Sequence, residues 1–310
     1  MRMRVSVAST AALLLVTGTA QAAVPTATTG AASAITQTTA KVSGSVKPNS
    51  ENTTWHFEIG STATYGTNTP EQGPVAPGAG TTSVSFDIVN LTPGTPYHYR
   101  LVATNPSGST GGNDRTFTTR PAVSIGTAQT VVQFGRSATL SGQVFGTTIN
   151  AITVTLQENP YPFAGWNDVS TTTTDAGGHY QFIRPVSANT AFRVVAQTKP
   201  PGTSSTAFVY EQDGVSLKAS TSRPRRGKSV LFTGFSVPAR VGGDVFVQRL
   251  GRGGWHTVLR AKLAPTTIAN FASFAVRMHK AVAGVYRAFV PGGFDHLAGS
   301  SAAKRIAIRR

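Results

Sequence analysis

The strongest constraint on the fold of this chain is the alternation of apolar and polar residues in short runs, which Gly- and Pro-containing segments separate. The run "TSVSFDIVNL" (82–91) places Val84, Phe86 and Ile88 on one side of an extended chain, because successive side chains of a strand point to opposite faces. Long stretches of Ala, Leu, Glu and Lys, the strong helix formers, are missing after the first 23 residues. The pattern predicts an all-β protein. Similar runs include "AKVSGSV" (40–46), "SATLSGQV" (137–144) and "GDVFVQR" (243–249).

The N-terminus "MRMRVSVASTAALLLVTGTAQAAVPT" is typical of an export signal. Arg2 and Arg4 precede a mostly apolar stretch over residues 5–19, and residues 20–22 form a small-x-small cleavage site. We therefore expect a signal peptide over residues 1–22. A membrane anchor is disfavoured because the apolar stretch is short and interrupted by Ser and Thr. The sequence predicts a secreted protein, extracellular or associated with a cell wall.

The chain contains no cysteine, and its six histidines show no metal-ligand spacing. Disulfides and thiolate metal sites are therefore excluded. An exported chain of this kind must be stabilised by core burial, which domains of about 90–100 residues achieve. We expect no metal and no cofactor.

The formal net charge of +16 is concentrated in the last third of the chain. Residues 24–120 carry five basic and five acidic side chains, and residues 121–214 carry four basic and five acidic ones. Residues 215–310 carry seventeen basic side chains, but only Asp244 and Asp295 as acids. This asymmetry predicts a polyanionic partner. A genome that favours Arg codons would explain many Arg residues, but not the scarcity of acids in this third alone.

The segment "LTPGTPYHYRLVATN" carries the pattern L-x-P-x-T-x-Y, with Leu91, Pro93 and Tyr97 at its fixed positions. In this segment the chain resembles a fibronectin type III domain, and the resemblance covers residues 23–120. It implies a seven-stranded sandwich that serves as a spacer or binding module. It also implies that Tyr97 is a buried corner tyrosine, whose hydroxyl bonds to the backbone upstream, and that Tyr99 occupies the next inward position.

Residues 121–214 and 215–310 form an internal repeat with an initial spacing of 92 residues. The shared landmarks predict the same turns and the same core in both copies, with Trp166 and Trp255 inside. The two copies loosely resemble immunoglobulin-like modules of bacterial surface proteins, which implies two further β-sandwiches. The matching landmarks are Gly135-Arg136-Ser137 with Gly227-Lys228-Ser229, Gly142 with Gly234, Trp166 with Trp255, and Phe192-Arg193 with Tyr286-Arg287.

Nothing in the sequence indicates an enzyme. No G-x-S-x-G elbow is present, and the Gly-Lys-Ser of "RPRRGKSV" lacks the first Gly of a phosphate-binding loop. The carboxylate pairs that glycoside hydrolysis would need are Glu211 with Asp213 and Asp168 with Asp175, and they fall at or near a proposed linker and turn. Asp175 is interpreted as a hairpin-turn residue rather than a calcium ligand. We expect no catalytic residues.

The basic side chains of residues 215–310 are the main functional candidates. They cluster at expected turns and strand ends, where they would project into water and reach an anionic polymer. Arg outnumbers Lys, which suits forked contacts with anionic oxygens. The partner would be a cell-wall polymer, an acidic polysaccharide or a nucleic acid. The candidates are Arg223, Arg225, Arg226, Lys228, Arg249, Arg252, Arg260, Lys262, Lys304, Arg305, Arg309 and Arg310.

Two alternatives from other classes stay open at this point. The protein could be an accessory carbohydrate-binding protein that reads neutral sugars through exposed aromatic side chains. It could also be an enzyme with an unfamiliar site, which would need a pocket lined by paired ionisable groups.

Overall fold

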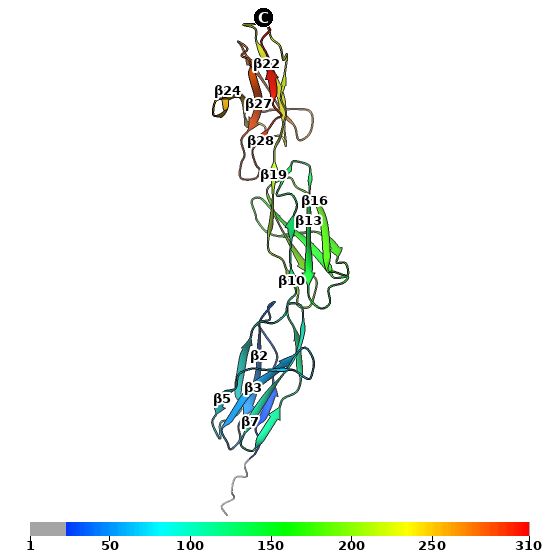
Figure 1. Cartoon of the computed structure of the whole chain (residues 1–310), viewed down its shortest axis with the longest axis vertical. Coiled ribbons are helices and arrows are strands. Elements are labelled where there is room, and N and C mark those ends of the chain that lie inside the picture. Colours follow the sequence, from blue (N-terminus) through cyan, green and yellow to red (C-terminus); the bar gives the residue numbers. More distant parts are fainter. Residues whose placement is uncertain (1–22, 310) are drawn as a thin grey trace, which may run out of the picture. The chain divides into compact units, whose positions relative to one another are not determined.

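The structure, a computed structural model, describes residues 23–309 (Figure 1). The expected signal peptide over residues 1–22 lies outside the described residues, as does Arg310. Every helix or strand assigned within the described part is a β-strand, so the prediction of an all-β fold is confirmed. In the same part, no helix is long and apolar enough to cross a membrane.

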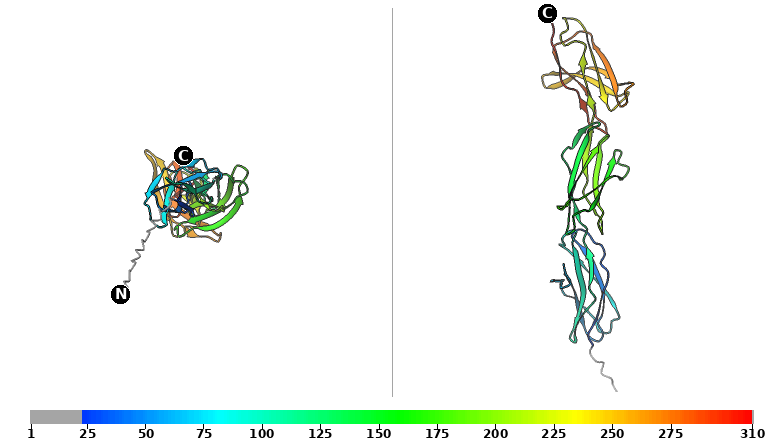
Figure 2. Two further views of the ribbon diagram at one scale, coloured as in Figure 1. Left: turned by 90° about the horizontal axis from the view of Figure 1, so that it is seen from below. Right: turned by 90° about the vertical axis from the view of Figure 1, so that its right-hand side faces the viewer.

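The chain divides into two compact units, and Figure 2 shows their strands from two further directions. The first comprises residues 23–91 and Pro96–Thr119, and the second comprises Thr92–Thr95 and residues 120–309. Three separate apolar cores lie within them, one in the first unit and two in the second. Each core lies between two sheets, so the chain forms three β-sandwiches, which we call the first, second and third in chain order.

The first sandwich pairs a small sheet with a larger one. The small sheet has the order β1-β2-β6, and the larger has the order β4-β3-β7-β8 with β5 also on β3 and β9 also on β7. Its strands are β1 (Thr26–Thr29), β2 (Ala40–Lys47), β3 (Thr53–Gly60), β4 (Thr67–Asn68), β5 (Gln72–Val75), β6 (Thr82–Ile88), β7 (Pro96–Asn105), β8 (Gly108–Gly111) and β9 (Arg115–Thr118).

Strand β7 carries the segment that suggested the fibronectin type III resemblance. Tyr99 is buried at 1% exposure, and its hydroxyl donates to the carbonyl oxygen of Gly30 at 2.7 Å. Tyr97 is only partly buried, packs against the same core and stacks on Phe117 with ring centroids 5.6 Å apart. Both tyrosines therefore belong to the inward face, as expected, but Tyr97 is only partly buried, and the buried tyrosine of this segment is Tyr99. The predicted bond of the Tyr97 hydroxyl to the backbone stays a prediction.

The second sandwich continues the chain with two sheets. One has the order β10-β13-β11 with β16 also on β13, and the other has the order β12-β19-β17-β14-β15 with β18 also on β17. Its strands are β10 (Ala122–Val123), β11 (Gly126–Thr127), β12 (Val131–Gln133), β13 (Ser137–Phe145), β14 (Thr153–Pro160), β15 (Asn167–Thr173), β16 (His179–Pro185), β17 (Thr190–Ala196), β18 (Gly202–Thr203) and β19 (Ala207–Gln212).

The third sandwich has nearly the same plan. One sheet has the order β20-β22-β26-β25 with β21 also on β22, and the other has the order β24-β23-β27-β28 with β29 also on β27. Its strands are β20 (Gly214–Val215), β21 (Lys218–Ala219), β22 (Val230–Val237), β23 (Asp244–Gly251), β24 (Gly254–Lys262), β25 (Ala264–Pro265), β26 (Ala272–Met278), β27 (Gly284–Val290), β28 (Gly299–Ser300) and β29 (Lys304–Ile306).

The internal repeat is visible in backbone detail. Gly142 and Gly234 both lie against the neighbouring strand, where an added Cβ would come within 2.0 Å of the Ser124 carbonyl oxygen and 2.1 Å of the Ser216 carbonyl oxygen, respectively. Only glycine allows this approach without displacing the strand. The ladders of β14 with β15 and of β23 with β24 also shift register at matching places, just before Gln157 and Gln248. The two copies therefore share local irregularities as well as strand order.

The two tryptophans were wrongly predicted to lie in the cores. Trp166 and Trp255 are half-buried and belong to no core cluster. Each ring is covered by a guanidinium instead, that of Arg193 at 4.3 Å and that of Arg287 at 4.5 Å from the ring centroid. The prediction failed because matching sequence positions indicate a shared environment, but not which side of the sheet provides it.

Candidate functional site

Strand direction brings several of the basic residues to one end of the third sandwich. Strands β22, β24 and β27 begin at this end, and β23, β26 and β29 finish there. In the ladder, Arg249 of β23 lies opposite Tyr286 of β27, which in turn lies opposite Lys304 of β29. Turns at this end therefore bring together cations from distant parts of the sequence.

The turn before β22 pairs with the end of the chain. The backbone N–H of Arg309 donates to the Pro224 carbonyl at 2.8 Å, and Arg225 and Arg309 form a parallel bridge. The loop after β26 joins them, since the N–H of Ala281 donates to the Lys228 carbonyl at 2.9 Å. The first basic cluster of the sequence and Arg309 from the last one are thus together in space.

We call this cluster the basic end. All its side chains are exposed, and none of them forms an ion pair with a carboxylate of residues 23–309. Lys280 belongs to it although the sequence analysis did not select it, because its loop position became adjacent to the turn only on folding. The basic end consists of Arg223, Arg225, Arg226, Lys228, Arg252, Lys280 and Arg309.

Both acids of the third sandwich lie at its opposite end. Asp244 starts β23 and lines a hollow together with Arg240 and His296. Lys262 pairs with Asp244 at 3.0 Å, so this one candidate cation is partly neutralised. The pair is exposed and contributes little to stability. Asp295 pairs with Arg240 at 2.8 Å.

The outer face of the sheet β24-β23-β27 combines arginine with aromatic rings. Arg260 lies over the Phe246 ring at 5.3 Å from its centroid. Arg287 lies over both Trp255 and Phe289, at 4.5 Å and 5.7 Å. A guanidinium that stacks on a ring still presents its N–H edge to an anion. We call these five residues the arginine–aromatic face.

The same face of the second sandwich has a different composition. Register places Thr155, Thr171 and Val195 where the third sandwich has Phe246, Arg260 and Phe289, respectively. The arginine, the tryptophan and a glutamine are common to both copies: Arg193 Nε donates to Gln157 at 2.6 Å, and Arg287 Nε donates to Gln248 at 2.8 Å. The shared trio maintains the sheet surface, and the added Phe and Arg side chains are specific to the third sandwich.

The carboxylate pair Glu211 and Asp213 lies in a buried charge cluster where the second sandwich passes into the third. Both side chains are 0% exposed, and Arg240 Nη2 lies 3.1 Å from Glu211 and 3.0 Å from Asp213. His296 lies 3.6 Å from Asp213 and 2.6 Å from Asp295. Because the two acids are enclosed and bonded to arginine, they hold the chain together here rather than face a polymer substrate.

Burial determines the protonation of this cluster. Desolvation, helped by the neighbouring Asp213 carboxylate, raises the pKa of Glu211 to about 8 although Arg240 acts to lower it. Desolvation also raises the pKa of Asp213. His296 and Arg240 hold the pKa of Asp295 below its usual value despite some desolvation. Burial therefore favours the protonated form of Glu211.

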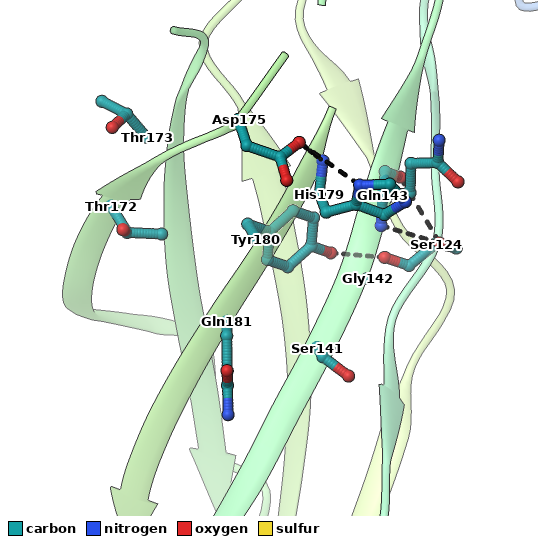
Figure 3. A pocket seen from close by; sticks show the side chains of 10 residues that line it. All are labelled: Ser124, Ser141, Gly142, Gln143, Thr172, Thr173, Asp175, His179, Tyr180 and Gln181. Carbon is teal, nitrogen blue, oxygen red and sulfur yellow. Dashed lines mark hydrogen bonds and ion pairs between the residues drawn. The ribbon is translucent and has the colours of Figure 1, made fainter. Parts of the chain in front are cut away.

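A polar hollow of about 710 Å³ on the second sandwich is the place where an enzymatic site would be sought (Figure 3). Its lining includes Ser124, Asp175, His179 and Tyr180. Asp175 Oδ1 accepts the backbone N–H groups of Gly177 and His179, both at 2.8 Å, and lies 3.2 Å from His179 Nδ1. These bonds lower the pKa of Asp175, and they are the bonds of a tight hairpin turn.

The hydroxyl of Ser124 is not bonded to His179 in this hollow. It accepts the backbone N–H of Gln143 at 3.0 Å and is held against β13. The Tyr180 hydroxyl donates to the Ser124 carbonyl, so it too serves the strand pairing. Among residues 23–309, no group of three or more His, Asp or Glu side chains is arranged to hold a metal ion.

Comparisons with known proteins do not show a family for this chain. No protein-family model matches the chain, and neither does any curated protein. Among solved structures, the chain is similar to the polymeric immunoglobulin receptor ectodomain of a teleost fish, with 11% sequence identity, a TM-score of 0.28, and coverage of 59% of this chain and 97% of that one.

Proposed function

We propose that this is an exported, non-enzymatic modular protein whose third sandwich binds an anionic polymer. The observation that carries the proposal is the basic end, seven exposed cations with no acidic partner among the described residues. Clustered cations without acids create a positive potential that attracts polyanions from a distance. The first sandwich, in keeping with its resemblance to a fibronectin type III domain, would act as a spacer or contact another partner.

The arginine–aromatic face extends the proposed surface along the sheet. Arg305 of β29 lies opposite Val285 of β27, so its side chain is on the same outward side as Arg287. Arg is suited to forked contacts with carboxylate, sulfate or phosphate oxygens. The polymer would therefore be a cell-wall polymer, an acidic polysaccharide or a nucleic acid, recognised by its charge density.

The proposal is tested with the purified chain on immobilised heparin, with salt as the variable. We expect retention that weakens steeply as salt rises, because binding releases counterions. Replacing Arg225, Arg226 and Lys228 together by Gln should shift elution to much lower salt.

The matched control removes the same number of charges elsewhere. Lys47, Arg136 and Lys199 are exposed and lie in the first and second sandwiches. Their joint replacement by Gln should change elution little, since no cluster is broken. Equal shifts for the two triple variants would show that net charge alone governs retention, and the proposed site would then be wrong.

A further inference from the structure

Five exposed aromatic side chains form a continuous row in the second unit, which we call the aromatic row. Neighbouring ring centroids are 6.5, 5.8, 6.3 and 6.5 Å apart along the row. Four of the rings are about 40% exposed, and Phe294 is 85% exposed. Exposed apolar patches of this kind mark interaction sites in soluble proteins. The row consists of Phe294, Tyr161, Phe163, Phe208 and Tyr210.

The row is built rather than accidental, because a buried asparagine fixes its loops. The Asn189 side-chain amide donates to the Phe294 carbonyl at 3.0 Å. The backbone carbonyl of Asn189 accepts the backbone N–H of Tyr161 at 2.9 Å. Its side-chain oxygen also accepts the N–H of Glu211, in the strand that carries Phe208 and Tyr210. One residue thus positions all three segments that supply the rings.

Phe163 provides a second sign of a constrained site. Its φ is +62°, a left-handed conformation that is uncommon for a bulky residue. The N–H of Phe163 donates to the Pro160 carbonyl at 2.8 Å, which holds the turn. The ring of Phe163 therefore lies between its neighbours in a turn whose backbone conformation is strained.

Polar groups next to the row indicate what it binds. A hollow of about 270 Å³ runs beside Tyr161 and is lined by Asn159, Asn167 and Trp166, with no charged residue in its lining. Asn159 Oδ1 accepts the N–H of Gly165 at 3.2 Å, and its amide N–H groups form no hydrogen bond with the described residues. Side-chain amides donate to and accept from hydroxyl groups.

We propose that the aromatic row binds a neutral polysaccharide. A sugar ring has an apolar C–H face that packs on an aromatic ring, and hydroxyls at its rim that bond to Asn159 and Asn167. The lining of the hollow contains no charged side chain, and the nearby guanidinium of Arg193 is already stacked on Trp166 and bonded to Gln157, which favours a neutral glycan over an acidic one. The amides favour a glycan over a lipid surface or an apolar peptide, which would leave them unpaired. The site is separate from the basic end and does not depend on it.

The test uses the full chain and a panel of neutral polysaccharides, namely cellulose, chitin and a soluble β-glucan, in pull-down and affinity electrophoresis. We expect retention by at least one of them that persists in salt of about 1 M, where surface charge is screened. The double variants Tyr161→Ala/Phe163→Ala and Phe208→Ala/Tyr210→Ala should each bind about tenfold or more weakly.

The control variant Phe145→Ala/Ile183→Ala removes two exposed apolar side chains outside the row and should bind like the wild type. Unchanged thermal unfolding of all variants shows that the fold is kept. The proposal is overturned if no polysaccharide retains the chain, or if the row variants bind as well as the wild type. It is equally overturned if the row instead mediates binding to phosphatidylcholine vesicles, or self-association measured by sedimentation.

Discussion

The second and third sandwiches share a strand plan but present different surfaces on the same sheet. Both have the trio of glutamine, arginine and tryptophan, as Gln157, Arg193 and Trp166 in the second sandwich. Around that trio the second sandwich has mainly threonine and valine, whereas the third has phenylalanine and arginine. The comparison separates residues that build the module from residues that specialise one copy of it.

The two ends of the third sandwich differ just as clearly. The end near the second sandwich holds both of its acids, Asp244 and Asp295. The far end holds cations without acidic partners among residues 215–309. Separating the charges in this way protects the basic end from internal neutralisation, so that its positive potential stays available to a partner.

The largest expected effect concerns the acid-rich end. Replacing Arg240 by Met leaves the buried Asp213 carboxylate without its cation and Glu211 without a donor, and breaking one side of a buried ion pair costs roughly 3–5 kcal/mol. Urea unfolding should show this loss. The control Arg277→Met removes an exposed guanidinium that bonds only to Ser229 among the described residues and should change stability little. If both variants lost similar amounts of unfolding free energy, the buried charge cluster at the acid-rich end would not be a special source of stability.

The same end should make stability depend on pH. The pKa of Glu211 is raised to about 8 in the folded protein, so folding favours the protonated form of this side chain. The stability that comes from this preference is fully present below the ordinary pKa of Glu, and it is lost as pH rises through 8. Asp213 acts in the same direction. The free energy of unfolding should thus fall by a few kcal/mol between about pH 5 and pH 8. Glu211→Gln should flatten this slope, and an unchanged slope would show that another group is responsible.

An exchange of surface residues tests whether the arginine–aromatic face is specific to one copy. Phe246→Thr, Arg260→Thr and Phe289→Val together give the third sandwich the surface of the second. Heparin affinity should fall by about tenfold, since one cation and two rings are lost. The reciprocal change of Thr155, Thr171 and Val195 should raise affinity to a lesser degree. If neither exchange alters binding, the face is not part of the site.

The smallest expected effect concerns the arginine of the shared glutamine–arginine–tryptophan trio. It distinguishes a role in stabilising the sandwich from a role in binding the polymer. Arg193→Ala and Arg287→Ala should each destabilise the protein by about 1 kcal/mol, because each removes a cation–π contact and a hydrogen bond. Thermal unfolding measures this similarity. Heparin binding should weaken only for Arg287→Ala. Equal binding losses would mean that the second sandwich also contributes to the surface.

Much of the fold could be predicted from local patterns. Alternation predicts the strands, and Tyr99 confirms that the inward face of β7 is the one the pattern selected. The repeat could also be predicted from the sequence, because Gly142 and Gly234 occupy matching positions. At each of them a neighbouring strand lies too close to leave room for a side chain. These features depend on residues near one another in the chain.

The sites were harder to predict because they depend on distant residues. Glu211 and Asp213 were visible as a pair, but Arg240 and His296 reach them only after folding. Lys280 could be found only once its loop was known to meet the turn at Lys228. The aromatic row has no sequence signature, since Tyr161, Phe208 and Phe294 come from three separate segments.

The pairing of β12 with β19 gives the second sandwich a mechanical property. The two strands run parallel and join Val131 with Tyr210 and Gln133 with Gln212, although one lies near the start of the sandwich and the other at its end. Tension applied to the two ends of this sandwich would therefore load all these backbone hydrogen bonds at once instead of opening them in sequence. We expect force spectroscopy to show that Val132→Pro, which removes one N–H from this pair, lowers the force at which the second sandwich yields.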